Sequence, residues 1–282
     1  MDAQLHSKTA IVTGASGGIG AAVVQALLHE NARVAVHYLS NRPEHPFLTT
    51  ESLERSRLEN LPPPPQFLPM QADLTQADEV ERLFTQTDKA FGPPEVLIAC
   101  AGKWVSEHVP IWEMSEAQWE DTWAVNVKSV FLCVRRFLQG VRDHKLERPA
   151  IVLVGSTSGS YGEAGHCDYA ASKAALMFGL MRSVMNEMTQ LAPCGRINVV
   201  SPGWVRTSMA DSLLQNKNEL RRTLQTNPLR KLASPADVAN TVVFLASAHL
   251  AGHITGEIVQ VSGGFEGGLL FSEGEIDLDA AT

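Results

Sequence analysis

The chain has 282 residues, with 44% hydrophobic and 19% charged side chains, which is the composition of a globular protein able to bury a core. This composition excludes disordered, collagen-like and coiled-coil classes. The 23 basic and 31 acidic residues give a formal net charge of −8, so the excess of cations that nucleic-acid binding requires is missing, and we expect no nucleic-acid partner.

Apolar runs typical of strands alternate with helical stretches along most of the chain. The strand runs are continuous in hydrophobicity, as burial on both faces of a parallel sheet demands. We therefore predict an α/β fold, a Rossmann-like, doubly wound parallel sheet of about seven strands with helices on both faces, in a single domain over residues 1–264. The predicted elements, in chain order, are a strand over 9–13, a helix over 18–30, strands over 33–38 and 66–72, a helix over 76–91, a strand over 96–99, a helix over 130–141, a strand over 150–155, a helix over 168–191, a strand over 196–200, a helix over 236–246 and a strand over 257–261.

Three segments depart from this alternation. Residues 39–65 end in four prolines, Pro62 to Pro65, which cannot join a sheet ladder, so we predict an enlarged surface connection with a helix-capable stretch over 50–60. Residues 203–232 are longer than the usual link from a strand to a helix and are predicted as a substrate-loop insertion, with a plain helical surface insertion as the alternative. Residues 265–282 form an acidic C-terminal tail for which we predict no structure.

A glycine-rich sequence, Thr13-Gly14-Ala15-Ser16-Gly17-Gly18-Ile19-Gly20, directly follows the first predicted strand. Glycines at 14, 18 and 20 allow a tight turn, a close approach of backbone N–H groups to a pyrophosphate, and packing of the helix on the strand. No Gly-Lys-Ser/Thr follows, which excludes a P-loop. The motif predicts a dinucleotide site, and a merely structural turn is the alternative.

The end of the second strand bears on the choice of cofactor. An NAD site places Asp or Glu there to bind the ribose 2′-hydroxyl, but this chain has no acid between Tyr38 and Glu44. Ser40, Asn41 and Arg42 are suited to a 2′-phosphate instead, so NADP(H) is favoured over NAD(H), with a solvated loop position as the alternative for Arg42.

A potential acid/base pair begins the helix predicted over 168–191. The i, i+4 spacing of Tyr169 and Lys173 places the phenol and the ammonium on one face, where a nearby cation favours the phenolate. Ser156 lies thirteen residues earlier, at the carboxyl end of a strand, which is the ligand-binding edge of open α/β sheets. Its hydroxyl is suited to hold a substrate oxygen while Tyr169 moves the proton. Each residue alone is as easily a surface or turn residue.

In this order, the motifs resemble the short-chain dehydrogenase/reductase family, in particular members similar to 3-oxoacyl-carrier-protein reductases. The resemblance covers residues from about 8 to 264 and includes Thr255-Gly256 near the last strand. It implies that Ser156 orients the carbonyl, Tyr169 donates or removes the proton, and Lys173 lowers the tyrosine pKa and binds the nicotinamide ribose. Asn126 would hold the water that links Lys173 to solvent, or else be bonded only within the fold. The implied cofactor-binding residues are Gly14, Ser16, Gly18, Ile19, Gly20, Tyr38, Ser40, Asn41, Arg42, Asp73, Leu74, Ala101, Gly102, Tyr169, Lys173, Pro202, Gly203, Val205 and Thr207; Asp73 would accept from the adenine amino group or simply start the next helix.

Two positions depart from the family pattern. Cys100, in Ala99-Cys100-Ala101-Gly102, replaces an asparagine that supports the sheet, and we expect a buried small hydrophobe there rather than a reactive thiol. Ser262 replaces the usual aspartate before the final glycine pair, which affects a structural corner and not the acid/base residues.

The predicted function is that of an NADP(H)-dependent carbonyl reductase, an oxidoreductase that interconverts a ketone and a secondary alcohol. The alternative is a nucleotide-binding protein of the same fold with a non-redox role, such as a cyclase or a regulatory partner. The side chains predicted nearest the substrate favour a bulky, fairly apolar ligand; they are Trp104, Tyr161, His166, Trp204, Met209 and Leu213, alongside Ser156, each of which is equally suited to the packed core.

Assembly and compartment follow from similar arguments. The resemblance implies a homo-oligomer, a tetramer or a dimer, in which helices at about 126–144 and 168–191 pair across a two-fold axis. The four cysteines form no C-x-x-C pair, which argues against a zinc knuckle or a disulfide framework, so we predict no metal and a reducing compartment. The first residues lack a signal peptide's apolar core, and no apolar stretch is long enough for a membrane span, so we expect a cytoplasmic protein.

Overall fold

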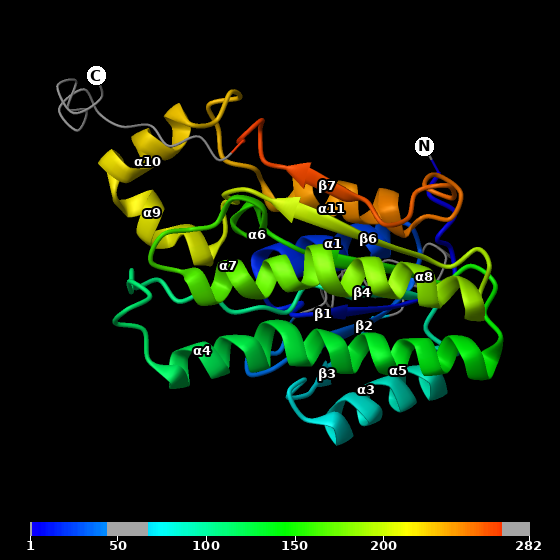
Figure 1. The fold of residues 1–282 in the computed structure, drawn as a ribbon. Coiled ribbons are helices and arrows are strands. Elements are labelled where there is room, and N and C mark those ends of the chain that lie inside the picture. The colour runs from blue at the N-terminus through cyan, green and yellow to red at the C-terminus, as the bar shows by residue number, and fades with distance from the viewer. Residues whose placement is uncertain (1, 44–66, 267–282) are drawn as a thin grey trace, which may run out of the picture.

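The computed structural model describes residues 2–43 and 67–266, apart from the side chains of residues 212, 219 and 222. At its centre, seven parallel strands form one sheet in the order β3-β2-β1-β4-β5-β6-β7 (Figure 1). The predicted single-domain, doubly wound parallel sheet is confirmed. The strands are β1 (Thr9–Thr13), β2 (Arg33–Tyr38), β3 (Phe67–Gln71), β4 (Val96–Ala99), β5 (Ala150–Val154), β6 (Arg196–Pro202) and β7 (Ile258–Val261).

Burial explains why the strands are so apolar. Every residue of the central strands β1, β4 and β5 is buried, whereas β3 and β7 at the two ends of the sheet are partly exposed. Pro69, which has no N–H to donate, lies in β3, where only one side of the strand pairs within the described sheet. Neighbouring residues of one strand face opposite cores, since Ile11 belongs to one apolar cluster and Val12 to the other.

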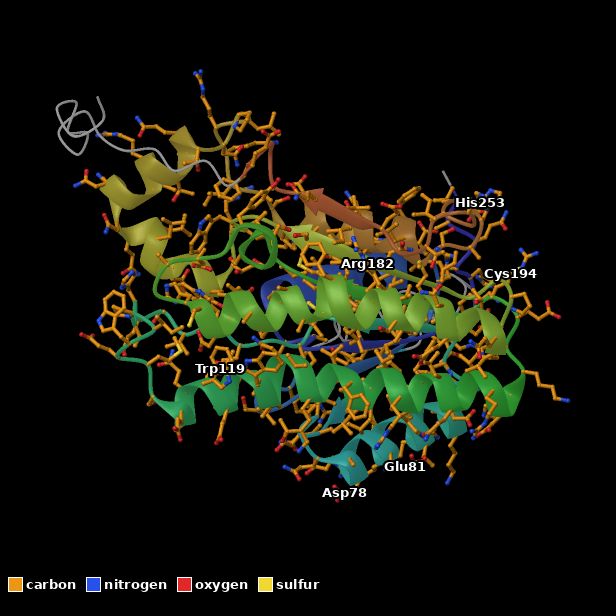
Figure 2. All side chains as sticks on the ribbon, in the orientation of Figure 1. Asp78, Glu81, Trp119, Arg182, Cys194 and His253 are labelled. Atoms are coloured by element: carbon orange, nitrogen blue, oxygen red, sulfur yellow. The ribbon has the colours of Figure 1, made fainter. Side chains whose placement is uncertain are left out.

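Helices cover both faces of the sheet. Helices α1 (Gly18–His29) and α11 (Pro235–Ala246) contribute to the core on one face. Helices α3 (Ala77–Phe91), α5 (Ser129–His144) and α8 (Met181–Leu191) contribute to the core on the other. Arg136 of α5 reaches the Glu81 carboxylate of α3 at 2.7 Å on the outside of this layer, where Figure 2 labels Glu81.

Two long helices each contain a π-helical segment. In the first, α4 (Glu116–Trp123) continues through the segment Ala124–Lys128 into α5. In the second, α7 (Cys167–Ala174) continues through Ala175–Leu180 into α8. The second confirms the helix predicted over 168–191. The helix predicted over 130–141 is too short, because it begins at Glu116, where the Ser115 side chain caps it by accepting from the Gln118 N–H at 3.2 Å.

The carboxyl ends of the strands form the edge at which ligands of such sheets bind. The strand order reverses between β1 and β4, so the loops after these two strands diverge there. Figure 1 shows α9 (Asp211–Gln215) and α10 (Lys217–Gln225) beyond this edge, near the start of α7. The 203–232 segment is therefore largely helical, and it includes a 3₁₀ turn at Ser208–Ala210.

Two predicted segments lie almost wholly outside the described residues. Of the connection over 39–65 the structure describes only 39–43, and of the tail over 265–282 only 265 and 266. Among the described residues, no helix is both long enough and apolar enough to cross a bilayer.

Candidate active site

The turn after β1 requires glycine. Gly14 has a φ of +63°, and a Cβ there would lie 2.7 Å from the Ala101 Cα, while a Cβ on Gly20 would lie 2.3 Å from the Gly14 carbonyl oxygen. The first turn of α1 carries no side-chain cap and no acidic residue, so its N–H groups point toward an open end with partial positive charge. A Cβ on Gly18 would lie 2.5 Å from the Thr207 side chain. Thr207, a predicted cofactor-binding residue in the loop after β6, therefore packs against this turn. The cradle fits the pyrophosphate of a dinucleotide.

A buried histidine, which the sequence did not single out, holds this turn. The Gly14 N–H donates to His37 Nδ1 at 3.0 Å, so the proton of the neutral ring is on Nε2, 2.9 Å from the Ala72 carbonyl. Burial lowers the pKa of His37, although the Ala72 bond and the Asp73 carboxylate oppose that shift. Neutral His37 thus ties the turn after β1 to the end of β3.

The Ser156–Tyr169 pair lies at the carboxyl end of β5. Ser156 caps α6 (Thr157–Tyr161), with its oxygen accepting from the Ser158 N–H at 3.2 Å, and its hydroxyl lies close enough to Tyr169, in the first turns of α7, to influence the tyrosine pKa. Burial raises the pKa of Tyr169 to about 12, against the lowering effect of the Ser156 hydroxyl. The predicted depression of the tyrosine pKa is therefore not seen in this structure, because loss of solvation outweighs it.

Lys173 lies in the same buried site. Its Nζ donates to the Val154 carbonyl at 2.8 Å and lies 5.6 Å from the centroid of the Tyr169 ring. Burial lowers the pKa of Lys173 to about 8. A Cβ on Gly102 would be 3.3 Å from this Nζ and 3.5 Å from Asn126 Oδ1, so the loop after β4 meets the acid/base residues here.

Asn126 is completely buried in the π-helical segment Ala124–Lys128. Its Oδ1 accepts from the Lys103 N–H at 2.7 Å, and its amide donates to the Lys103 carbonyl at 2.9 Å and to Ser172 Oγ at 3.0 Å. The side chain thereby fastens the loop after β4 to α7, next to Lys173. This is the bonding within the fold that the sequence left open as an alternative to a role in holding water.

Cys100 carries its supporting bonds through the backbone. The N–H groups of Cys100 and Ala101 both donate to Thr13 Oγ1, at 3.0 and 3.1 Å, which joins β1 to β4 at the point where the strand order reverses. Burial raises the pKa of the Cys100 thiol to about 11, as expected for a small hydrophobe rather than a reactive group.

Most of the other residues predicted to bind the cofactor lie close to the ends of β2, β3 and β6. Ser40, Asn41 and Arg42 are exposed just after β2. Asp73 accepts from the Thr75 N–H at 2.9 Å and from its hydroxyl at 2.8 Å, bonds that lower the pKa of Asp73 and form the turn into α3. The others are exposed at Ser16 and Gly102, partly buried at Ile19, Tyr38, Ala101 and Gly203, and buried at Leu74, Pro202 and Val205.

Only some of the predicted substrate residues come together. The Trp104 ring lies 4.9 Å from that of His166 and 5.8 Å from that of Trp204, which makes one aromatic cluster from three separate segments. Tyr161 lies elsewhere, accepting from the Gln260 amide at 3.3 Å. Met209 is exposed, and Leu213 is buried with 1% of its surface accessible, so the substrate contact of Leu213 stays a prediction.

A carboxylate near Ser156 was also missed. Ser156 Oγ donates to Ser158 Oγ at 3.1 Å, and Ser158 Oγ donates to Glu163 at 2.6 Å. Glu163 lies in the loop between α6 and α7, and its carboxylate is 3.9 Å from His166 Nε2. The only sign of this contact in the sequence was an acidic residue five positions after Ser158. Spacing alone does not show that the chain between them brings the Glu163 carboxylate back to the Ser158 hydroxyl.

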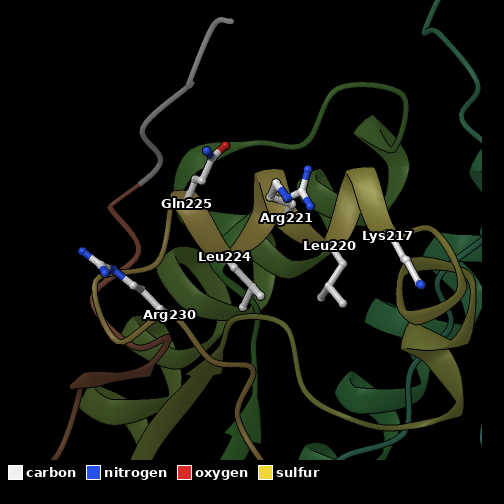
Figure 3. A pocket seen from close by; sticks show the side chains of 6 residues that line it. All are labelled: Lys217, Leu220, Arg221, Leu224, Gln225 and Arg230. Atoms are coloured by element: carbon white, nitrogen blue, oxygen red, sulfur yellow. The ribbon is translucent and has the colours of Figure 1, made fainter.

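The inserted segment has a hollow of its own. Residues of α10 and Arg230 line an open hollow of about 680 Å³, in which Leu220 and Leu224 form the apolar part and Lys217, Arg221 and Arg230 the cationic part (Figure 3). Neither Tyr169 nor Trp104 lines it. Among the described residues, no group of three or more His, Cys, Asp or Glu side chains is arranged to hold a metal ion.

Comparisons with known proteins agree on one group. Residues 14–266 match a family model described as enoyl-(acyl carrier protein) reductase. The chain is 32% identical over 260 residues to 3-oxoacyl-(acyl-carrier-protein) reductase FabG of Staphylococcus aureus, covering 92% of this chain and 98% of that one. It is 35% identical over 262 residues to (3R)-3-hydroxyacyl-CoA dehydrogenase of Canis lupus familiaris, covering 93% and 97%. A crystal structure of a short-chain dehydrogenase/reductase from Brucella melitensis superposes with a TM-score of 0.77 at 30% identity, covering 94% of this chain and 99% of the other.

Proposed function

The chain belongs to the short-chain dehydrogenase/reductase family, and we propose that it is an NADP(H)-dependent oxidoreductase that reduces a ketone to a secondary alcohol. The observation that carries this proposal is the buried Tyr169 phenol, with the Ser156 hydroxyl and the Lys173 ammonium beside it, at the strand edge where the glycine turn lies. Hydroxyl, phenol and ammonium are the groups needed to hold a carbonyl oxygen and protonate it.

The protonation states favour reduction. With a pKa of about 12, Tyr169 is protonated at neutral pH and is therefore able to give a proton to a ketone oxygen. With a pKa of about 8, Lys173 is mostly charged at the same pH and stabilises the phenolate that remains. Ser156 orients the ketone oxygen toward Tyr169. In the opposite direction Tyr169 would have to start as the phenolate, which burial disfavours.

The residues that would hold a nicotinamide cofactor fit it. The open first turn of α1 would bind the pyrophosphate, Thr207 against Gly18 would close over it, and Lys173 would bind the nicotinamide ribose. When bound, the cofactor supplies the hydride. Exposed Arg42, with Ser40 and Asn41 and without an acid at the end of β2, supports a 2′-phosphate and hence NADP(H) over NAD(H).

The substrate belongs beside the aromatic cluster. Trp104, His166 and Trp204 provide an apolar wall for a bulky ligand, and His166 precedes α7, which carries Tyr169. The names of two relatives specify a 3-oxoacyl and a 3-hydroxyacyl group on a carrier, so a 3-oxoacyl thioester is the first compound to test.

Assembly is proposed from exposed aromatic residues on the two long helices. Phe131 and Phe178 are 44% and 42% exposed, each with an arginine, Arg135 or Arg182, stacked over its ring. Large exposed apolar groups on helix surfaces are typical of an interface. They support a homodimer or homotetramer in which these helices pair across a two-fold axis.

The test is an absorbance assay with NADPH and a panel of ketones that includes a short 3-oxoacyl thioester of coenzyme A. The proposal predicts oxidation of NADPH with at least one member, and faster turnover than with NADH. If NADPH binds but no member of a broad panel is turned over, a non-redox, nucleotide-binding role replaces the proposal.

A further inference from the structure

The open hollow on α10 combines an apolar surface with a group of cations. Figure 3 shows Leu220 and Leu224 next to each other along the helix, with Lys217 beyond one of them and Arg230 beyond the other. Arg221 lies on the helical turn between the two leucines and lines the same hollow. Both leucines are partly buried, whereas the three cations are exposed. A ligand in the hollow would therefore meet an apolar surface flanked by positive charge.

The cations of the hollow have no counterion in the protein. Among the described residues, no ion pair or side-chain hydrogen bond involves Lys217, Arg221 or Arg230. Elsewhere, Lys8 and Lys103 each pair with a carboxylate. The segment 206–231 contains six basic and two acidic residues, although the formal net charge of the whole chain is −8. Positive charge is thus concentrated on this segment, where its field attracts an anion.

An unusual backbone conformation sets the position of Arg230. Its φ is +51°, in the left-handed region that few residues other than glycine adopt. The Arg230 N–H donates to the Asn227 carbonyl at 2.8 Å, and the Leu229 N–H donates to the Gly263 carbonyl at 3.1 Å, so this turn is tied to the chain that follows β7. Conformations of this kind cluster at ligand clamps. The turn fixes the point at which Arg230 leaves the main chain.

The hollow belongs to the same inserted segment as part of the aromatic cluster. The ends of the segment are joined to each other, because the Ala233 N–H donates to the Trp204 carbonyl at 3.0 Å and the Arg206 N–H donates to the Ala233 carbonyl at 2.9 Å. Thr207, near its start, packs on Gly18 of the cofactor turn. Figure 1 shows α10 farther out, beyond the carboxyl ends of the strands. A long ligand held at one end beside the aromatic cluster would extend outward along this segment toward the hollow.

We propose that Lys217, Arg221 and Arg230 bind a phosphate ester that the substrate carries on an apolar arm, with Leu220 and Leu224 against the arm. This inference rests on the function proposed above, and it specifies the substrate as an acyl group on a phosphorylated carrier rather than a free ketone. Phosphate oxygens suit the guanidinium forks of arginine and the ammonium of lysine. The pantetheine arm of a carrier thioester has the required order of groups, with the thioester first, then a dimethyl-substituted carbon, then the phosphate ester.

Two thioesters form a matched pair for the kinetic test. Acetoacetyl-coenzyme A and acetoacetyl-N-acetylcysteamine share the ketone and the thioester, but only the first carries phosphate. NADPH-dependent reduction of both is measured in the unaltered protein, in the double variant Lys217→Gln/Arg230→Gln and in Arg221→Gln. The controls are Lys231→Gln, at an exposed cation of the same segment that does not line the hollow, and Lys89→Gln, at an exposed cation of α3.

The double variant should raise KM for the coenzyme A thioester by about tenfold and leave kcat within about twofold, because the lost bonds hold the substrate equally in the ground state and the transition state. KM for the phosphate-free thioester should not change in any variant. Arg221→Gln should give a smaller rise in KM for the coenzyme A thioester, and both lysine controls should match the unaltered protein.

A calorimetric titration tests the hollow without catalysis. Coenzyme A, 4′-phosphopantetheine and pantetheine are titrated with the cofactor site saturated by NADP⁺, so that coenzyme A cannot bind there. Coenzyme A should bind at least about tenfold more tightly than pantetheine, and the double variant should lose this difference. Equal affinities for 4′-phosphopantetheine and coenzyme A would assign the hollow to the phosphate that coenzyme A shares with carrier proteins. Tighter binding of coenzyme A alone would assign it to the phosphates of the nucleotide part.

The inference would be overturned by an unchanged KM for the coenzyme A thioester in the double variant, or by a rise that is equal for both thioesters or that Lys231→Gln also shows. Equal binding of coenzyme A and pantetheine would overturn it too. If neither thioester is reduced, yet the double variant loses the binding of coenzyme A, the proposed function fails and the phosphate site stands. If circular dichroism shows that the double variant is unfolded, Arg221→Gln decides by the same criteria.

Discussion

Mild acid should destabilise the glycine turn through His37. The ring accepts from Gly14 at Nδ1, so protonating Nδ1 sets two N–H groups against each other, and burial already lowers the pKa of His37 below its ordinary 6.5. A histidine with a lowered folded pKa binds fewer protons folded than unfolded. Its contribution is therefore complete above pH 6.5 and is lost as pH falls from 6.5 toward the folded pKa. The limiting slope is about 1.4 kcal/mol per pH unit, so the free energy of unfolding falls by at most about 1 kcal/mol between pH 6.5 and 5.5.

Urea unfolding at pH 7.5, 6.5 and 5.5 measures this loss, and NADPH binding at the same pH values shows whether the turn weakens with it. In His37→Gln, the amide oxygen can accept from Gly14 and the amide nitrogen can donate to Ala72, but the side chain does not titrate. Most of the acid-induced decrease in the free energy of unfolding should therefore disappear. His6→Gln, at an exposed histidine, is the control and should show the same decrease as the unaltered protein. An equal decrease in His37→Gln and the unaltered protein would refute the reasoning.

Three further predictions concern the cofactor site and assembly. Gly20→Ala places a Cβ 2.3 Å from the Gly14 carbonyl oxygen, so it should cost about 1–3 kcal/mol in urea unfolding and weaken NADPH binding; unchanged values would show that the turn can relax. Arg42→Ala should reduce the difference in binding free energy between NADPH and NADH by about 1–3 kcal/mol, as measured by titration calorimetry. Equal affinities of the unaltered protein for NADPH and NADH would contradict the NADP(H) assignment. Light scattering at micromolar concentration should give a dimer or tetramer, and a 30.6 kDa particle would contradict the proposed assembly.

The central strands of this fold were predictable because they are buried on both faces. The bounds predicted for β1, β2 and β4 agree with the structure residue for residue. Helix α4 was missed because its residues, several of them tryptophan and acid, form no clear apolar stripe before the chain enters α5. The π-helical segments could not be read, since one extra residue in a turn leaves no mark on an apolar pattern.

The site was predictable as a set of residues but not as a network. Order along the chain was enough to single out Ser156, Tyr169 and Lys173, which the fold places together. Burial reverses the expected direction of the Tyr169 pKa shift, and burial depends on the whole fold rather than on a spacing of four residues. The contacts of Glu163 and His37 join positions set by loop and strand geometry, for which the sequence carries no local signal.

The central claim is that Tyr169 protonates the substrate, and the turnover of Tyr169→Phe at pH 7 tests it most directly. The change removes one hydroxyl and leaves the ring and the cofactor cradle in place, so kcat for ketone reduction should fall by at least ~10²-fold while NADPH affinity, measured by fluorescence titration, stays within about twofold. Near-normal turnover in Tyr169→Phe would mean that Ser156, water or another group supplies the proton, and would contradict the mechanism even though the fold stands.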